Sequence, residues 1–241
     1  MIIIPARIGS SRFPNKVLAD VAGLPMVIRT AKAVEKIDKV AIATDSEEVI
    51  KMAQSHGITA VMTSAKHNSG TERIFEAAQK LNLEDDEIII NVQGDEPFIE
   101  EEVVKAVFDL TLKNRNDKQV MMNSCYKMMS NPEADDPNIV KLISSDKERA
   151  LYFSRAKIPY PRDHAFNDYK GHLGIYGFTK KSLKHFCQLP PAPLEEIEKL
   201  EQLRALYHGF SIAMVQVETK SFGIDTIQDL EKALKTHNLE N

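Results

Sequence analysis

Short apolar runs rich in β-branched residues alternate with helix-like patterns through the first half of the chain, and this alternation constrains the fold strongly. The strand-like runs are residues 2–5, 39–44, 59–63 and 87–92, and the helical patterns begin near Pro25, Glu47 and Thr71. Strands separated by helices are typical of a parallel sheet. We therefore predict an α/β fold with a Rossmann-like, mostly parallel sheet flanked by helices.

The same strand-like runs indicate where a ligand binds. Residues 2–5 and 88–91 are apolar at successive positions, as in central strands that are buried on both faces. Right-handed crossovers would bring the loops that follow the strands to one edge of the sheet, where open α/β sheets bind ligands. We therefore expect the site among the loops after residues 5, 44 and 92.

The second half of the chain has a less regular pattern. Residues 121–138 are rich in Asn, Pro and Asp and predict irregular structure, and residues 151–178 carry many aromatic side chains with only short apolar alternation. We expect one α/β domain over residues 1–241, with an embedded smaller, strand-rich lobe at about 120–180.

Three further elements are predicted after this lobe. They are a helix over 193–209, a strand over 211–217 and a last helix over 226–237. The helix over 193–209 has apolar residues at helical spacing, and we expect these to be buried: Ile197, Leu200, Leu203 and Leu206.

Composition and charge exclude several classes of protein. The 241 residues are 43% hydrophobic and 27% charged, which is ordinary for a globular protein. The formal net charge of −4 gives no bulk attraction to nucleic acid or to an anionic membrane, so we expect neither as a partner. No apolar run approaches the length of a membrane span or a signal peptide. Cys125 and Cys187 lie far apart and suggest neither a disulfide framework nor a zinc site, so we expect a cytoplasmic protein with reduced thiols.

The loop PARIGSSRFPNK, residues 5–16, concentrates positive charge directly after the first strand. Arg7, Arg12 and Lys16 lie among Gly and Ser residues, and no acidic residue precedes Asp20. Two guanidinium groups and an ammonium suit several phosphate oxygens at once, and the small residues let backbone amides approach a ligand. The alternative is a basic surface turn. Because bunched like charges repel one another, we favour a triphosphate site, although the loop is neither a Walker A nor a GxGxxG motif.

Two separated carboxylates are candidate metal ligands. Asp95 and Glu96 follow a very apolar strand in NVQGDEP, where one carboxylate is a reasonable Mg²⁺ ligand, although a Gly-Asp turn explains the same letters. Asp225, in FGIDT, is either a second ligand or the N-cap of the last helix. Sequence separation leaves open whether Asp95 and Asp225 meet.

The start of the predicted helix near Thr71 carries a second anion-binding pattern. Ser69, Thr71 and Arg73 lie at the helix N-terminus, which suits an anion or a ribose. A capping box between Ser69 and Glu72 explains the same letters without a ligand.

In the second half, basic and aromatic residues are interleaved. Arg155, Lys157 and Arg162 lie among aromatic residues, and His172 and Tyr176 would point to one face of a strand above Gly174. This set suits a polyhydroxylated, acidic ligand. The alternative is that His172 and Tyr176 are satisfied edge residues. Glu201 and Gln202 flank the apolar stripe of the helix and indicate nothing alone.

Taken together, these motifs resemble the 3-deoxy-manno-octulosonate cytidylyltransferase family, the CMP-Kdo synthetases. The likeness spans nearly the whole chain. It is carried by IIPAR, SRFPNK, ATDSE, SGTER, NVQGDEP, ALYFSRAKIP, HLGIYGF, PLEEIEKLEQLRAL and GIDT. PARxxSxRxPxK and NVQGDEP are shared with other sugar-acid cytidylyltransferases, whereas ALYFSRAxIP, HLGIYG and LEQLR are specific. The sequence departs from the family pattern at Asn15, where Gly is frequent, and at SCYKMM, where the family strand is more apolar.

The resemblance implies a nucleotide-diphospho-sugar transferase type of fold, a homodimer, and CTP and Kdo as substrates, with Mg²⁺ as cofactor on Asp95 and Asp225. It implies a catalytic set of Arg12, Lys16 and Asp95. The implied nucleotide-binding residues are Pro5, Ala6, Arg7, Ser11, Arg12, Lys16, Ser69, Thr71, Arg73 and Gln93. The implied sugar-binding residues are Arg155, Arg162, His172, Tyr176, Glu201 and Gln202, with the lobe at 120–180 serving sugar binding and dimerisation.

The reaction expected from this resemblance is attack of the anomeric C2 hydroxyl of Kdo on the α-phosphorus of CTP, with pyrophosphate leaving in line. Arg7 and Arg12 would hold the leaving pyrophosphate, and Lys16 would lie nearest the bond that breaks. The product would be CMP-Kdo for lipopolysaccharide biosynthesis. Two alternatives remain at this point: a cytidylyltransferase for another sugar acid, and a nucleotide-binding module without turnover.

Overall fold

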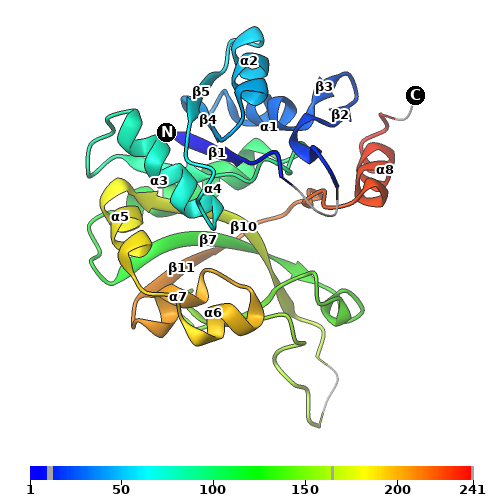
Figure 1. Ribbon diagram of the computed structural model, residues 1–241. Helices are drawn as coiled ribbons and strands as arrows, with labels where there is room; N and C mark the ends of the chain where they lie inside the picture. Colours follow the sequence, from blue (N-terminus) through cyan, green and yellow to red (C-terminus); the bar gives the residue numbers. More distant parts are fainter. Residues whose placement is uncertain (10–12, 164–165, 240–241) are drawn as a thin grey trace.

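A nine-stranded sheet forms the centre of the molecule in the computed structural model, which describes residues 1–9, 13–163 and 166–239. The main path of the sheet has the order β11-β7-β10-β6-β1-β4-β5, and helices cover both of its faces (Figure 1). Of the pairings along this path, β11–β7, β6–β1, β1–β4 and β4–β5 are parallel. The expected α/β fold with a mostly parallel sheet is confirmed.

The first half of the chain supplies the parallel core that its alternating pattern predicts. The strands are β1 (Ile2–Ala6), β4 (Val40–Thr44), β5 (Thr59–Met62) and β6 (Ile88–Asn91), and the helices are α1 (Met26–Val34), α2 (Glu47–Ser55) and α3 (Gly70–Lys80). Because β1 pairs in parallel with both β4 and β6, the loops after these three strands meet at one edge of the sheet. The three loops therefore lie at one edge of the sheet, as predicted.

The second half joins the same sheet through one long antiparallel strand. The strands are β7 (Val120–Met129), β8 (Lys141–Ser144), β9 (Ala150–Ser154), β10 (Tyr169–Thr179) and β11 (Ser211–Gln216). β10 pairs antiparallel with both β6 and β7 and so connects the two halves. β8 pairs with β10 and β9 off the main path.

The segment 121–138, expected to be irregular, is instead partly a central strand. Residues 120–129 form β7, in which polar residues interrupt the apolar pattern of a strand. The side chains of these residues form hydrogen bonds within the sheet: Asn123 donates to the Gly177 carbonyl at 3.3 Å and Ser124 donates to the Ile175 carbonyl at 2.7 Å. Met121, Met122 and Met129 of this strand are buried within the fold, whereas Met128 is 38% exposed.

The prediction of a single helix over 193–209 is wrong. The chain forms two short helices, α6 (Pro193–Glu198) and α7 (Leu203–Tyr207), because Lys199 adopts a left-handed conformation with φ 54°. The break rotates the first helix away from the core, so that Ile197 is 78% exposed while Leu200 and Leu203 are buried as expected.

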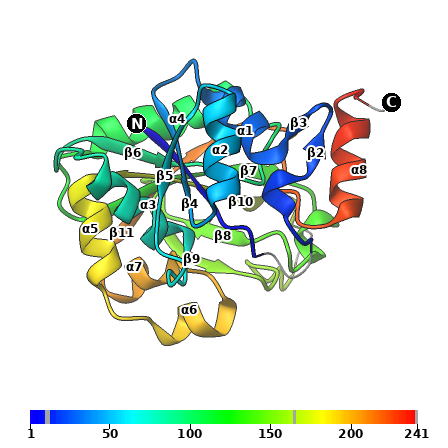
Figure 2. The same ribbon diagram turned by 45° about the horizontal axis from the view of Figure 1, so that its top comes forward.

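The remaining elements are the expected last helix, α8 (Ile227–Thr236), and several that are short or were not anticipated. The latter are η1 (Lys16–Leu18), β2 (Asp20–Val21), β3 (Leu24–Pro25), α4 (Glu101–Asn114), η2 (Glu133–Asp135) and α5 (Lys180–Gln188). Asn15, directly before η1, has φ 56°, a conformation that Gly adopts freely and Asn tolerates, which explains the departure from the family pattern there. Figure 2 shows α8 beside the β2–β3 hairpin, where Val21, Ile224 and Ala233 share a hydrophobic cluster.

Two large hydrophobic clusters fill the two faces of the sheet. Ile2 and Ile4 of β1 pack with α1, α2 and α4 on one face, whereas Ile3 packs with α3, α5 and α7 on the other. This alternation follows from the two-residue period of a strand. Within the described ranges, no helix is long and apolar enough to cross a membrane.

Candidate active site

A pocket of about 340 Å³ lies at the edge of the sheet where β1 and β6 end. Its lining residues come from the loops after these strands, from the start of α3 and from the segment before α8. They are Pro5, Arg7, Lys16, Val17, His67, Asn68, Ser69, Gly70, Arg73, Gln93, Gly94, Asp95 and Asp225. A side chain at Gly94 would place its Cβ 3.0 Å from the Pro5 carbonyl oxygen, so the absence of one lets the two loops meet closely.

Lys16 joins the two carboxylates whose meeting the sequence left open. Its Nζ lies 2.6 Å from Asp95 Oδ2 and 2.8 Å from Asp225 Oδ1. The N-cap of α8 is Thr226, whose side chain accepts a hydrogen bond from the Asp229 amide, so the capping alternative for Asp225 is wrong. The Asp225 carboxylate is directed to the pocket instead.

The charge state of Lys16 follows from opposing effects. Burial works to lower the pKa of Lys16, but the Asp95 and Asp225 carboxylates outweigh it and raise this pKa above its usual value. Lys16 is therefore held as a cation at the floor of the pocket. Glu96 follows Asp95 in the chain, and burial together with the charge of Asp95 raises the pKa of the Glu96 carboxyl to about 7.

Ser69 caps α3, and only part of the predicted capping box forms. The Ser69 hydroxyl accepts from the Glu72 amide at 3.2 Å, while the Glu72 carboxylate accepts from the Asn68 amide rather than from that of Ser69. Thr71 donates to Glu201 Oε2 at 2.5 Å. This bond joins the predicted nucleotide segment to the predicted sugar segment, a link that sequence reasoning missed because the two residues are 130 positions apart.

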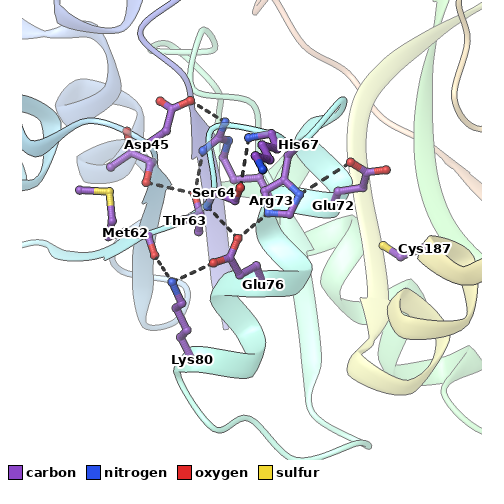
Figure 3. Close-up of polar contacts among 12 residues, drawn as sticks. Asp45, Met62, Thr63, Ser64, His67, Glu72, Arg73, Glu76, Lys80 and Cys187 are labelled. Atoms are coloured by element: carbon purple, nitrogen blue, oxygen red, sulfur yellow. Dashed lines mark hydrogen bonds and ion pairs between the residues drawn. The ribbon is translucent and has the colours of Figure 1, made fainter.

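Arg73 lines the pocket from a fixed position. Its Nη2 lies 2.8 Å from Asp45 Oδ2 and its Nη1 donates to Thr63 Oγ1 at 2.7 Å (Figure 3). These partners follow β4 and β5, so one guanidinium ties three pieces of the sheet edge together. Arg73 and Asp45 are 28 positions apart, and no local sequence pattern predicts their ion pair.

His67 is a pocket-lining residue that sequence reasoning did not select. Its Nε2 lies 2.5 Å from Glu76 Oε2, which also accepts from the Ser64 amide, and Lys80 contacts the other carboxylate oxygen (Figure 3). Burial works to raise the pKa of Glu76, but these donors lower it to about 2. A charged anchor on α3 therefore holds the loop that leads into the helix.

His172 and Tyr176 lie together on β10, as their spacing on one strand suggested, and neither is among the residues that line the pocket. Their ring centroids are 5.4 Å apart, and Ser124 Oγ lies 3.0 Å from His172 Nε2. Gln93 donates to the Gly174 carbonyl at 3.3 Å, so the space above Gly174 contains the Gln93 side chain. Burial lowers the pKa of His172 to about 3, raises the pKa of the Tyr176 phenol, and raises the pKa of Glu201.

The other predicted site residues lie in different surroundings. Arg155 donates to the carbonyls of Glu198 and Pro137, and Arg162 is 88% exposed on the loop beyond it. Gln202 is buried at the start of α7, and Ala6 is buried at the end of β1. Two predicted residues, Ser11 and Arg12, lie outside the described residues.

Comparison with known proteins places the chain in a family. A family profile described as Cytidylyltransferase matches residues 1–231. A 3-deoxy-manno-octulosonate cytidylyltransferase from a Nitratiruptor species is 56% identical over 96% of this chain and 97% of its own length. The chain belongs to the 3-deoxy-manno-octulosonate cytidylyltransferase family. Another member of this family, from Wolinella succinogenes, is 51% identical over 98% of both chains.

A solved structure agrees with this family assignment. The structure of a CMP:2-keto-3-deoxy-manno-octonic acid synthetase complexed with CTP matches with a TM-score of 0.89 and 38% identity, over 98% of each chain. The specific motifs ALYFSRAKIP, HLGIYGF and LEQLR had indicated the 3-deoxy-manno-octulosonate cytidylyltransferases within the sugar-acid cytidylyltransferases, and this expectation is confirmed.

The donor set at the floor of the pocket fits a divalent cation. Asp95 and Asp225 already converge on one positive centre, the Lys16 ammonium. Mg²⁺ characteristically takes one or two protein carboxylates and completes its shell with water and phosphate oxygens. No group of three or more His, Cys, Asp or Glu ligands occurs within the described part of the chain. Two carboxylates therefore suffice as the protein's part of such a shell.

Proposed function

We propose that the protein transfers the CMP group of CTP to the anomeric hydroxyl of 3-deoxy-D-manno-octulosonate (Kdo), releasing pyrophosphate and forming CMP-Kdo for lipopolysaccharide biosynthesis. The observation that carries the proposal is the Lys16 ammonium held between Asp95 and Asp225 in a pocket of about 340 Å³. Membership of the family and the CTP complex of a 38% identical structure support the choice of nucleotide and sugar acid.

The residues of this pocket act by positioning and by neutralising charge, which are the main requirements of nucleotidyl transfer. Arg7 lines the pocket and is proposed to bind the outer phosphates together with Arg12. Lys16 is proposed to lie beside the α-phosphate, where its cation stabilises the charge that develops as pyrophosphate leaves. The start of α3 is proposed to bind the nucleotide through Ser69, Thr71 and Arg73, with Gln93 between nucleotide and sugar.

Asp95 and Asp225 are proposed to hold Mg²⁺. When bound, the ion would neutralise phosphate charge and lower the pKa of a coordinated hydroxyl. The support is that both carboxylates face one cationic centre at the pocket floor.

The sugar acid is proposed to bind on the β10 side of the pocket. Tyr176 and His172 are adjacent there, and Glu201 reaches the start of α3 through Thr71. Neutral imidazole and phenol groups suit sugar hydroxyls as hydrogen-bond partners. Gln202 and the guanidinium groups of Arg155 and Arg162 complete the proposed sugar set.

The substrate assignment is tested by measuring pyrophosphate release with components omitted one at a time. Release should require CTP, Kdo and Mg²⁺ together and should fall by orders of magnitude when UTP replaces CTP. Strong turnover with a nonulosonic acid or an amino-Kdo, combined with none with Kdo, would overturn the choice of sugar acid. Release without Mg²⁺ in the presence of a chelator would overturn the metal assignment.

We further propose that the protein is a cytoplasmic homodimer. Its described cysteines, Cys125 and Cys187, are unpaired thiols, as in a reducing compartment. Exposed apolar side chains lie on the neighbouring elements β9, α6 and α7, namely Leu151, Ile197 and Tyr207. Burying these side chains against a second copy of the chain would remove apolar surface from water.

A further inference from the structure

Asp225 reaches the pocket on an irregular segment that crosses the molecule. Residues 217–226, here called the strap, run from the end of β11 to the start of α8, and Figure 1 shows this segment as the orange trace between the two. The described residues of the strap form no helix or strand. Its path must therefore be fixed by individual contacts.

One fixed point of the strap is a buried hydrogen bond to the residue beside Asp95. Ser221 Oγ donates to Glu96 Oε2 at 2.9 Å. Glu96 is 7% exposed and Ser221 is 2% exposed. Because water is nearly excluded, losing either partner would leave the other polar group unsatisfied.

A second acidic residue of the same loop holds two more groups of the strap. Glu100 Oε2 accepts from Thr219 Oγ1 at 2.5 Å, and Glu100 Oε1 accepts from the Lys220 amide at 2.9 Å. Both carboxylate oxygens of one side chain are thus bonded to consecutive strap residues. This bidentate arrangement restricts the strap more than a single bond does.

Beyond these contacts the strap is fixed next to Asp225 itself. The Ile224 amide donates to the Asp95 carbonyl at 2.9 Å, and Ile224 is fully buried. Glu96, Glu100 and Asp95 all belong to the short segment between β6 and α4. One loop therefore carries one proposed metal ligand and also holds the segment that carries the other.

We propose that Glu96 and Glu100 are positioning residues that hold the strap so that the Asp225 carboxylate faces Asp95 and Lys16. The inference rests on the proposed function for its catalytic consequence, but the geometry of the strap can be tested without it. An irregular segment of this length loses a large conformational entropy when ordered, so loss of its bonds frees it readily. A displacement of about 1 Å at a reacting centre reduces the rate by about 100-fold.

The first test measures the strap without any substrate. Glu100→Ala should speed amide hydrogen exchange at Lys220 and Ile224 by more than about tenfold, the effect of losing about 1.4 kcal/mol. Exchange at Ile90, in β6, should not change. Glu102→Ala is the matched control, since Glu102 is an exposed acid in the first turn of α4, two residues after Glu100. Unchanged exchange at Lys220 and Ile224 in Glu100→Ala would overturn the proposal.

The second test asks whether the effect passes through Asp225. Glu100→Ala should lower kcat for CMP-Kdo formation by about 10- to 100-fold, with a smaller change in KM for CTP. In an Asp225→Asn background the same change should have little further effect, because the carboxylate that it displaces is already gone. A full additional loss there would overturn the positioning role.

Two further variants separate positioning from folding. Glu100→Gln keeps an oxygen acceptor and should recover most of the protection at Lys220, whereas Ser221→Ala should resemble Glu100→Ala. The proposal is wrong if the Lys220 amide exchanges as fast in Glu100→Gln as in Glu100→Ala, while both variants have the melting temperature of the wild type. If the wild type fails to release pyrophosphate from CTP with Kdo, the proposed function fails, and the exchange experiment still decides the strap.

Discussion

At the scale of single residues, Lys16 contacts two carboxylates at the floor of the pocket. In the wild type, the Lys16 ammonium lies between the Asp95 and Asp225 carboxylates. Lys16→Met removes this cation and leaves the two negative charges facing each other. We expect kcat to fall by about 100- to 1,000-fold, the usual loss when one electrostatic donor to a transition state is removed. Steady-state pyrophosphate release measures this, and a Lys16→Met variant with near-normal kcat would contradict the role given to Lys16.

His172 makes the stability of the fold depend on pH. Burial lowers its pKa to about 3 from an ordinary 6.5, so between these values the unfolded state binds more protons than the folded state. The contribution of His172 to the free energy of unfolding is fully present above pH 6.5 and is lost as the pH falls toward 3.

The expected loss is about 2 kcal/mol between pH 6.5 and pH 5, because one pKa unit corresponds to about 1.4 kcal/mol. Urea unfolding of the wild type and of His172→Gln at both pH values measures it, with exposed His185→Gln as the control. An equal pH dependence in the wild type and His172→Gln would show that His172 does not titrate with folding.

Residue types in local motifs selected Lys16, Asp95 and Asp225 as separate candidate site residues, and only the resemblance to a family implied that they act in one site. Lys16 and Asp95 follow the strands β1 and β6 within a few to ten residues, and Asp225 lies two residues before α8, so each belongs to a short motif whose pattern is readable. The hydrogen bonds between Thr71 and Glu201 and between Ser221 and Glu96 join residues more than 120 positions apart. Because such bonds form only when the sheet brings their partners together, no local pattern predicts them. His67 was missed because its partner Glu76 appears only as one more acid on a helix.

At the scale of elements, the loop between β5 and α3 depends on one charged anchor. Glu76 binds the Ser64 amide, His67 and Lys80, and the loop that it holds lines the pocket (Figure 3). Glu76→Gln should raise KM for CTP by about tenfold, since a hydrogen bond to a charged group contributes roughly 1.5–3 kcal/mol. The effect on kcat should be smaller.

The matched control for this anchor is Lys80→Met. Lys80 contacts the outer side of the Glu76 carboxylate and is half exposed, so its loss should change KM little. Steady-state kinetics with CTP as the varied substrate compares the two variants. Equal KM values for Glu76→Gln and the wild type would mean that the loop keeps its place without the anchor.

Elements were predictable where one pattern dominated the local sequence. β1, β4 and β6 are nearly continuous apolar runs that are buried in the sheet, and β5 is a short, mostly apolar run at the end of the strand order. β7 was missed because Asn123 and Ser124 interrupt its pattern, although both are satisfied within the sheet. The helix over 193–209 has an unbroken helical period, and only the left-handed Lys199 shows that it is divided.

At the scale of the whole molecule, the proposed homodimer has a defined test. Sedimentation equilibrium should give twice the 27.1 kDa mass of the chain. Leu151→Asp should shift the mass toward one chain, because it places a charge among exposed apolar groups of the proposed interface. The mass of a single chain for the wild type at micromolar concentration would contradict the dimer.

Catalysis is proposed to depend on two carboxylates, Asp95 and Asp225, that distant parts of the chain bring to Lys16. The most direct measurement is the kcat for pyrophosphate release from CTP with Kdo and Mg²⁺, compared between the wild type and Asp95→Asn, with thermal unfolding showing that both are folded. We predict that Asp95→Asn loses several orders of magnitude in kcat, as expected when a group that acts on the transition state is removed. A folded Asp95→Asn variant with near-wild-type kcat would contradict the central claim.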